Sequence, residues 1–200
     1  MEKKKILVAT KKFIQNQFAG ESTGHDYFHI ERVVKNVKLI SAKENAHPFL
    51  TELAAWLHDL GDPKLHNGTD KSEELITQFL REQDADASTI SSIIEIVSQV
   101  SFSKGKTAQT IEAKIVQDAD RLDAIGAIGL ARVFAFGGSR NREIYNPEEP
   151  KDTSIQHFYD KLLKLKDLMH TDTAKAIALQ RHQFMETFLQ RFYKEWDGEI

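Results

Sequence analysis

The sequence predicts an all-α protein, and three observations support that prediction. Apolar residues recur three and four positions apart along most of the chain, which is the spacing of one helix face. Gly, Pro, Asp and Thr residues stand between these segments, where they favour the beginning or end of a helix. No segment shows the sustained alternation of apolar and polar residues that is typical of a β-strand. We therefore expect a bundle of about seven to nine helices.

Length and composition limit the classes of protein to consider. Residues 1–200, of which 40% are hydrophobic, are expected to form one domain with a substantial core. The net charge of -3 lacks the basic excess of a dedicated nucleic-acid binder, so a small charged partner is expected and a nucleic-acid polymer is not. No apolar stretch is long enough to span a membrane. We expect a cytoplasmic protein without a membrane partner.

The absence of cysteine restricts any metal site. With no thiol in the chain, a disulfide and a thiolate metal site are both excluded. A metal ion would have to be held by imidazole and carboxylate groups.

The first three helices are expected over residues 3–18, over 26–45, and from Pro48 to about residue 60. Asp26 is a suitable N-cap for the second helix, and Pro48 suits the first position of the third. On the second helix, His29 and Arg32 lie three positions apart and outside the apolar stripe. The nearby guanidinium favours a neutral His29, and neutral imidazole is the form that binds metals.

The third helix carries the most informative pair, His58-Asp59. Apolar residues surround more than half of this helix, which indicates a central position in the bundle, and Gly61 and Pro63 end it. Neighbouring residues point about 100° apart, so His58 and Asp59 can share an ion only near the helix end. A buried carboxylate here would require a counter-ion, whereas a polar pair facing water would not. The pair alone leaves both alternatives open.

The remaining helices are expected from a capping box at Asp70 and Glu73, then over 88–100, 111–136, 154–169 and 173–196, the last with Thr171 as its N-cap. In the 111–136 segment, Asp118 and Asp120 point about 200° apart, so at most one can face a central site. Asp120 is chosen because it stands between Ala119 and Leu122, where burial is expected.

Together, His29, His58, Asp59 and Asp120 supply two imidazoles and two carboxylates, a set suited to a divalent ion such as Mn, Fe, Co, Ni or Mg. Their order, with GHDYFHIERV at 24–33 and DADRL at 118–122, resembles the HD-domain metal-dependent phosphohydrolase superfamily. The segment HFYDKLLKL at 157–165 is similar to the bacterial subgroup of nucleotide pyrophosphohydrolases.

The resemblance implies that these four residues bind one divalent ion, for which Mn is the first expectation. It also implies that Asp62, three residues after the His-Asp pair, orients or deprotonates the attacking water. Arg32 and Lys64 are expected to bind the substrate and neutralise phosphoryl charge during catalysis. A turn residue before Pro63 is the structural alternative for Asp62.

Further substrate contacts are expected from two other places. His66 is a candidate substrate ligand, with a second metal site as the alternative. Arg140, Arg142 and Tyr145 lie in the long irregular segment after residue 136, where they could hold a nucleotide by its phosphates and by base stacking. A solvated loop is the alternative for this segment.

The expected reaction is hydrolysis of a (deoxy)nucleoside triphosphate to the monophosphate and pyrophosphate. One alternative is a phosphodiesterase for cyclic or linear dinucleotides, but Asp62 stands where that branch commonly has Lys, and no Gly-Tyr-Pro signature follows. The other alternative is a regulatory module that retains the metal and binds a phosphorylated ligand. The sequence leaves the oligomeric state open, with a homo-oligomer as one alternative.

Overall fold

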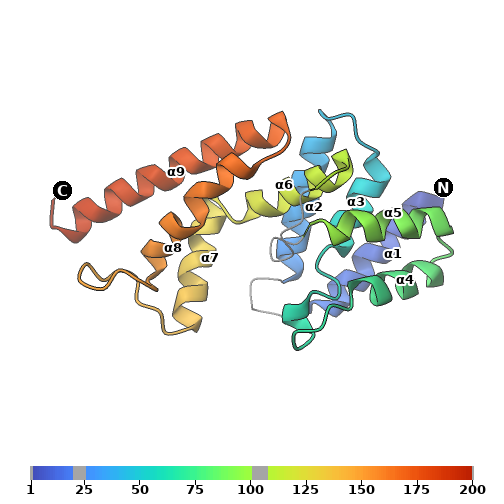
Figure 1. The fold of residues 1–200 in the computed structure, drawn as a ribbon, viewed down its shortest axis with the longest axis horizontal. Coiled ribbons are helices and arrows are strands. Elements are labelled where there is room, and N and C mark those ends of the chain that lie inside the picture. The colour runs from blue at the N-terminus through green and yellow to red at the C-terminus, as the bar shows by residue number, and fades with distance from the viewer. Residues whose placement is uncertain (1, 20–25, 101–107, 200) are drawn as a thin grey trace. The chain divides into compact units, whose positions relative to one another are not determined.

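A computed structural model of the chain describes residues 2–19, 26–100 and 108–199 (Figure 1). Throughout these ranges the regular structure is helical and no strand occurs, so the all-α prediction is confirmed. The contacts between Cα atoms divide the chain into two compact units, Met1–Ala119 and Asp120–Ile200. The expectation of a single domain stays a prediction.

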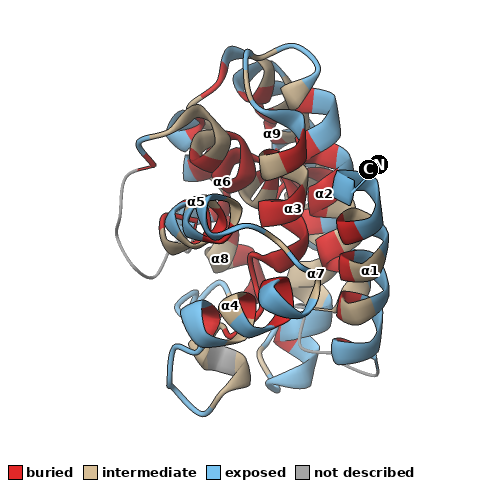
Figure 2. Cartoon of the chain, turned by 90° about the vertical axis from the view of Figure 1, so that its right-hand side faces the viewer, coloured by how far each residue is buried: buried red, intermediate tan, exposed pale blue. Residues whose placement is uncertain are grey.

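The first unit is built around one central helix, α3. Its elements are α1 (Glu2–Gln17), α2 (Tyr27–Ser41), α3 (Pro48–Leu57), the 3-10 turn η1 (Pro63–Leu65), α4 (Ser72–Glu82), α5 (Ala87–Ser98) and the larger part of α6 (Ile111–Asp123). α3 packs against α1, α2 and α5, and it is buried along nearly its whole length (Figure 2). This burial explains why its apolar residues surround the helix instead of forming a stripe.

Local signals in the sequence set most of the helix ends. Asp26 caps α2, with its carboxylate accepting the backbone N–H of His29 at 2.6 Å, and Pro48 occupies the first turn of α3. The expected capping box at Asp70 is wrong. Lys71 precedes α4 without a side-chain cap, and Asp70 instead accepts the backbone N–H of Ser72 at 3.0 Å.

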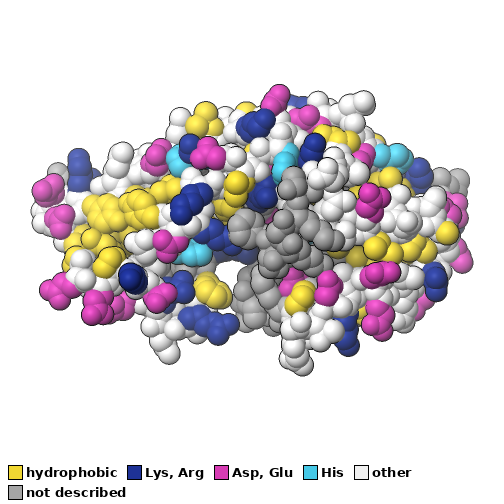
Figure 3. All heavy atoms as spheres, viewed as in Figure 1, with side chains coloured by type: hydrophobic (Ala, Val, Ile, Leu, Met, Phe, Trp, Pro, Cys, Tyr) yellow, Lys and Arg dark blue, Asp and Glu magenta, His cyan; other side chains and the backbone are white. Residues whose placement is uncertain are grey.

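The second unit contains the end of α6, then α7 (Gly126–Ser139), α8 (Ser154–Asp160), the 3-10 helix η3 (Leu162–Leu168) and α9 (Asp172–Trp196). α9 packs against α7 and η3. At the C-terminal end of α9, hydrophobic side chains gather on the surface (Figure 3). In the described part of the chain no single helix is long and apolar enough to cross a membrane, although α6 and α7 reach that length and hydropathy as a bent pair.

Two predicted helices of this region are wrong in their continuity. The segment 111–136 is not one helix, because α6 ends at Asp123 and α7 begins at Gly126, whose φ of +76° favours glycine. A Cβ atom on Gly126 would also press against the side chain of Arg181. The segment 154–169 is likewise divided, since α8 ends at Asp160 and the tighter η3 follows.

Candidate metal centre

The His-Asp pair lies in a tight turn directly after the central helix. His58 is the C-cap of α3, and the backbone N–H of Asp62 donates to the carbonyl of Asp59 at 3.1 Å. Gly61 closes the turn with a φ of +87°, and its carbonyl accepts the N–H of Lys71 at 3.0 Å, just before α4. The sequence placed the pair at a helix end, and the structure shows that end.

The protonation of one imidazole follows from its hydrogen bond. Nδ1 of His58 lies 2.8 Å from the carbonyl oxygen of Ala55. A carbonyl oxygen only accepts hydrogen bonds, so Nδ1 carries a proton, and in the neutral ring the lone pair is on Nε2. This arrangement fixes both the tautomer and the direction of the ring, as partners of metal-binding histidines commonly do.

The carboxylate of Asp59 brings the two histidines together. Oδ1 of Asp59 lies 3.4 Å from Nε2 of His58, and Oδ2 lies 3.5 Å from Nε2 of His29. The two imidazole rings are 5.5 Å apart between centroids. All three residues are buried, with His29 only 1% exposed. The first unit therefore presents two imidazole nitrogens and a carboxylate at one place.

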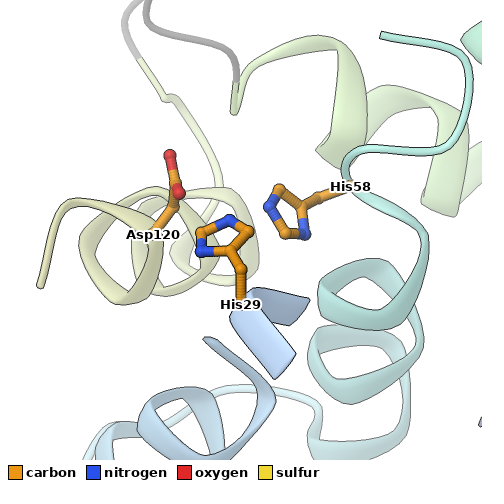
Figure 4. A group of neighbouring side chains, drawn as sticks. All are labelled: His29, His58 and Asp120. Atoms are coloured by element: carbon orange, nitrogen blue, oxygen red, sulfur yellow. The ribbon is translucent and has the colours of Figure 1, made fainter. Parts of the chain in front are cut away.

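Asp120 joins this group from α6. The boundary of the two units falls directly before Asp120, inside α6, and residues 111–119 of the same helix belong to the first unit. Ligand atoms of His29, His58 and Asp120 all lie within 4.8 Å of one another (Figure 4). Asp118 is fully buried, whereas Asp120 is only partly buried. Asp120 is the candidate metal ligand because its carboxylate lies in this group, and not because of its burial. The burial argument from the sequence was wrong.

The donor set fits a divalent first-row ion. Two imidazoles and two carboxylates combine borderline nitrogen ligands with hard oxygen ligands, which suits Mn, Fe, Co and Ni and leaves Mg as an alternative. Two carboxylates in a largely buried place also favour a bound cation. His29, His58, Asp59 and Asp120 are thus the residues that would hold such an ion.

Two helix-positioning residues near the centre escaped the sequence reasoning. Asn36 on α2 donates from Nδ2 to the carbonyl of Ala119 at 3.3 Å, and Gln117 on α6 donates from Nε2 to the carbonyl of Gln99 at 2.9 Å. Both side chains are buried. A signal for Asn36 did exist, because it follows His29 by seven positions and therefore stands on the same side of the helix.

The residues expected to take part in catalysis lie close in sequence to the candidate metal ligands. Arg32 stands one turn after His29 on α2 and is partly buried, as is Asp62 in the turn after Asp59. The side chain of Lys64 lies outside the described residues. His66 is partly buried after η1, with its backbone N–H bonded to the carbonyl of Pro63 at 3.2 Å. Their roles stay predictions.

The remaining expected substrate residues belong to the second unit. The guanidinium of Arg140 lies 5.6 Å from the ring centroid of Phe136, and Arg140 and Arg142 line a pocket of about 350 Å³. The ring of Tyr145 packs edge-on against Phe192, Tyr193 and Trp196. These contacts give Tyr145 a packing role in the second unit, and nucleotide contacts from this segment stay a prediction.

The chain is similar to known proteins of one family. The family model of the HD domain matches residues 26–125. The YpgQ protein of Bacillus subtilis is 39% identical over 207 residues, which cover 99% of this chain and 97% of YpgQ. The crystal structure of YpgQ in complex with ADP superposes with a TM-score of 0.83 and 37% identity. The match covers 97% of this chain and 100% of the YpgQ chain.

A second solved structure is similar to this chain over nearly its whole length. A Bacillus thuringiensis HD-superfamily hydrolase is 40% identical, with a TM-score of 0.84 and 98% of each chain covered. The matched segment contains all four candidate metal ligands. This chain belongs to the HD-domain phosphohydrolase superfamily.

Proposed function

We propose that this protein is a metal-dependent phosphohydrolase that acts on nucleotides, with nucleoside triphosphate hydrolysis to the monophosphate and pyrophosphate as its reaction. The observation that carries the proposal is the convergence of His29, His58, Asp59 and Asp120 in a member of this superfamily. A divalent ion held there supplies a Lewis acid that polarises a phosphoryl oxygen and makes water a better nucleophile near neutral pH.

The protein's own groups would supply the remaining chemistry. Asp62 follows Asp59 in the same turn, and its carboxylate would take the proton of the attacking water or hold that water in line. Arg32 would bind two phosphoryl oxygens at once through its planar guanidinium. Asp62 would thus act as the general base, and Arg32 would stabilise the negative charge of the phosphoryl group.

Support for a nucleotide substrate comes from a relative. YpgQ of B. subtilis, which shares 37% of aligned residues with this chain, has been crystallised with ADP. A nucleoside diphosphate shares the base, the sugar and the α- and β-phosphates of a triphosphate, so we expect a nucleotide ligand for this chain as well.

The experiment is a panel of nucleoside and deoxynucleoside triphosphates, incubated with metal-free protein to which Mn²⁺ or Mg²⁺ is added back. Products are separated so that pyrophosphate and orthophosphate are measured independently. The proposal predicts metal-dependent release of pyrophosphate and monophosphate. Tight nucleotide binding with no product would instead favour the regulatory module, and turnover of dinucleotides alone would favour the phosphodiesterase.

A further inference from the structure

Asn36 is a buried polar residue to which the proposed chemistry assigns no role. It is 9% exposed and lies on α2, the helix that contributes His29. Seven residues separate the two positions, so their side chains leave the helix in directions only about 20° apart. Asn36 therefore extends the face of α2 on which the first metal ligand stands.

The contact of Asn36 is with the backbone of α6. Its Nδ2 donates to the carbonyl of Ala119 at 3.3 Å, and Ala119 directly precedes Asp120. A carbonyl oxygen has two lone pairs, so Ala119 can accept this bond as well as a bond within its own helix. α2 thus contributes one ligand and holds the helix that contributes another.

A second bond restrains the same helix. Gln117 donates to the carbonyl of Gln99, which lies at the end of α5. With Asn36 and Gln117 both bonded to backbone, sliding or turning α6 breaks two buried hydrogen bonds. Metal–ligand distances tolerate only about 0.2 Å, whereas one residue of helix rise is about 1.5 Å. A small shift of α6 is therefore enough to remove Asp120 from an ion.

We infer that Asn36 is a positioning residue for the metal centre, and that its bond to Ala119 sets the affinity of the centre for a divalent ion by fixing the place of Asp120. The inference rests on the proposed function in one respect, that this cluster binds a divalent ion. Residues that orient metal ligands commonly change affinity by about 10- to 100-fold when they are replaced.

The test compares Asn36→Leu with Val37→Ala. Leucine removes the amide donor and keeps the branching and the number of side-chain heavy atoms, while the neighbouring Val37, 1% exposed on the same helix, loses only apolar contacts in Val37→Ala. Mn²⁺ affinity is measured by calorimetry on metal-free protein without nucleotide, and the stability of each metal-free variant is measured by urea unfolding. We expect Asn36→Leu to raise the Kd by about tenfold or more and Val37→Ala to leave it unchanged.

Two results overturn the inference: a wild-type Kd in Asn36→Leu, or an equal rise of Kd in Val37→Ala. If Asn36→Leu does not fold, Asn36→Asp keeps the size and replaces the donor with an acceptor. Because the added charge attracts a cation, a higher Kd in Asn36→Asp still indicates that Asp120 has been displaced. An unchanged or lower Kd contradicts the inference. A wild-type protein that binds no divalent ion contradicts the proposed function as well, which separates the two failures.

Discussion

Oδ2 of Asp59 lies 3.5 Å from Nε2 of His29, although the first residue follows α3 and the second lies in the first turn of α2. The other oxygen of the same carboxylate lies 3.4 Å from Nε2 of His58. A single turn after the central helix therefore brings both imidazoles to one carboxylate, and α6 adds Asp120 beside them.

Asp120 and Asp118 offer a matched comparison on one helix. We expect Asp120→Asn to weaken Mn²⁺ binding by at least about 10- to 100-fold, because an amide is a poorer ligand than a carboxylate. Asp118→Asn should leave the affinity unchanged, because Asp118 is buried and outside the group of ligand atoms. Calorimetric titration of both metal-free proteins checks this. A larger loss of affinity in Asp118→Asn would exchange the two roles.

Arg32 should be sensitive even to a change that keeps its charge. We expect Arg32→Lys to lower kcat/KM by about 10- to 100-fold, because an ammonium cannot hold two phosphoryl oxygens in the same plane. Metal occupancy should stay at the wild-type level. Steady-state kinetics and elemental analysis of the same preparation measure both quantities. Wild-type turnover on every nucleotide would assign Arg32 a structural role.

Gly61 and Gly68 separate backbone strain from steric contact. Both have a φ near +90°, but a Cβ on Gly61 would collide with the backbone of Lys71 and Ser72, whereas a Cβ on Gly68 would meet open space. We expect Gly68→Ala to lose about 1 to 3 kcal/mol of unfolding free energy from strain alone. Gly61→Ala should lose more, and it should also weaken Mn²⁺ binding because the turn that carries the His-Asp pair must shift.

Urea unfolding in the presence of a chelator measures the stabilities, and titration with Mn²⁺ measures the affinities. Equal losses of stability in the two alanine variants would show that the contact between Gly61 and the start of α4 is unimportant.

Asp62 tests the catalytic part of the account apart from metal binding. Asparagine keeps the shape of this side chain and removes its basicity. We expect Asp62→Asn to lower kcat by about 10²- to 10⁴-fold with nearly unchanged metal affinity. Turnover within a few-fold of wild type would remove Asp62 from the mechanism, and loss of the ion would make it a metal ligand.

The sequence was sufficient for features that depend on local signals. Apolar spacing predicted the helices, Asp26 and Thr171 were identified as caps, and Gly61 marked the turn after α3. Residue patterns offered the four candidate ligands, and the order of these ligands carried the family resemblance. The helices, caps and turn could be predicted because each depends on a short stretch of residues.

Features that depend on packing could not be read in this way. The break before Gly126 involves the side chain of Arg181, far away in the sequence, and the apolar residues around it continue the helical spacing. The bond between Asn36 and Ala119 joins two helices whose relative position no periodicity gives. The burial of Asp118 reverses the expectation from its neighbours for the same reason.

The most direct test of the central claim is the stoichiometry of Mn²⁺ in metal-free wild type and in His58→Ala and Asp59→Ala, with pyrophosphate release followed in the same samples. His47→Ser is the matched histidine control, because His47 is an exposed helix cap and serine preserves the cap. The account predicts one ion per chain and turnover in wild type and in His47→Ser, with neither in the other two variants. One ion per chain in His58→Ala or Asp59→Ala would contradict it.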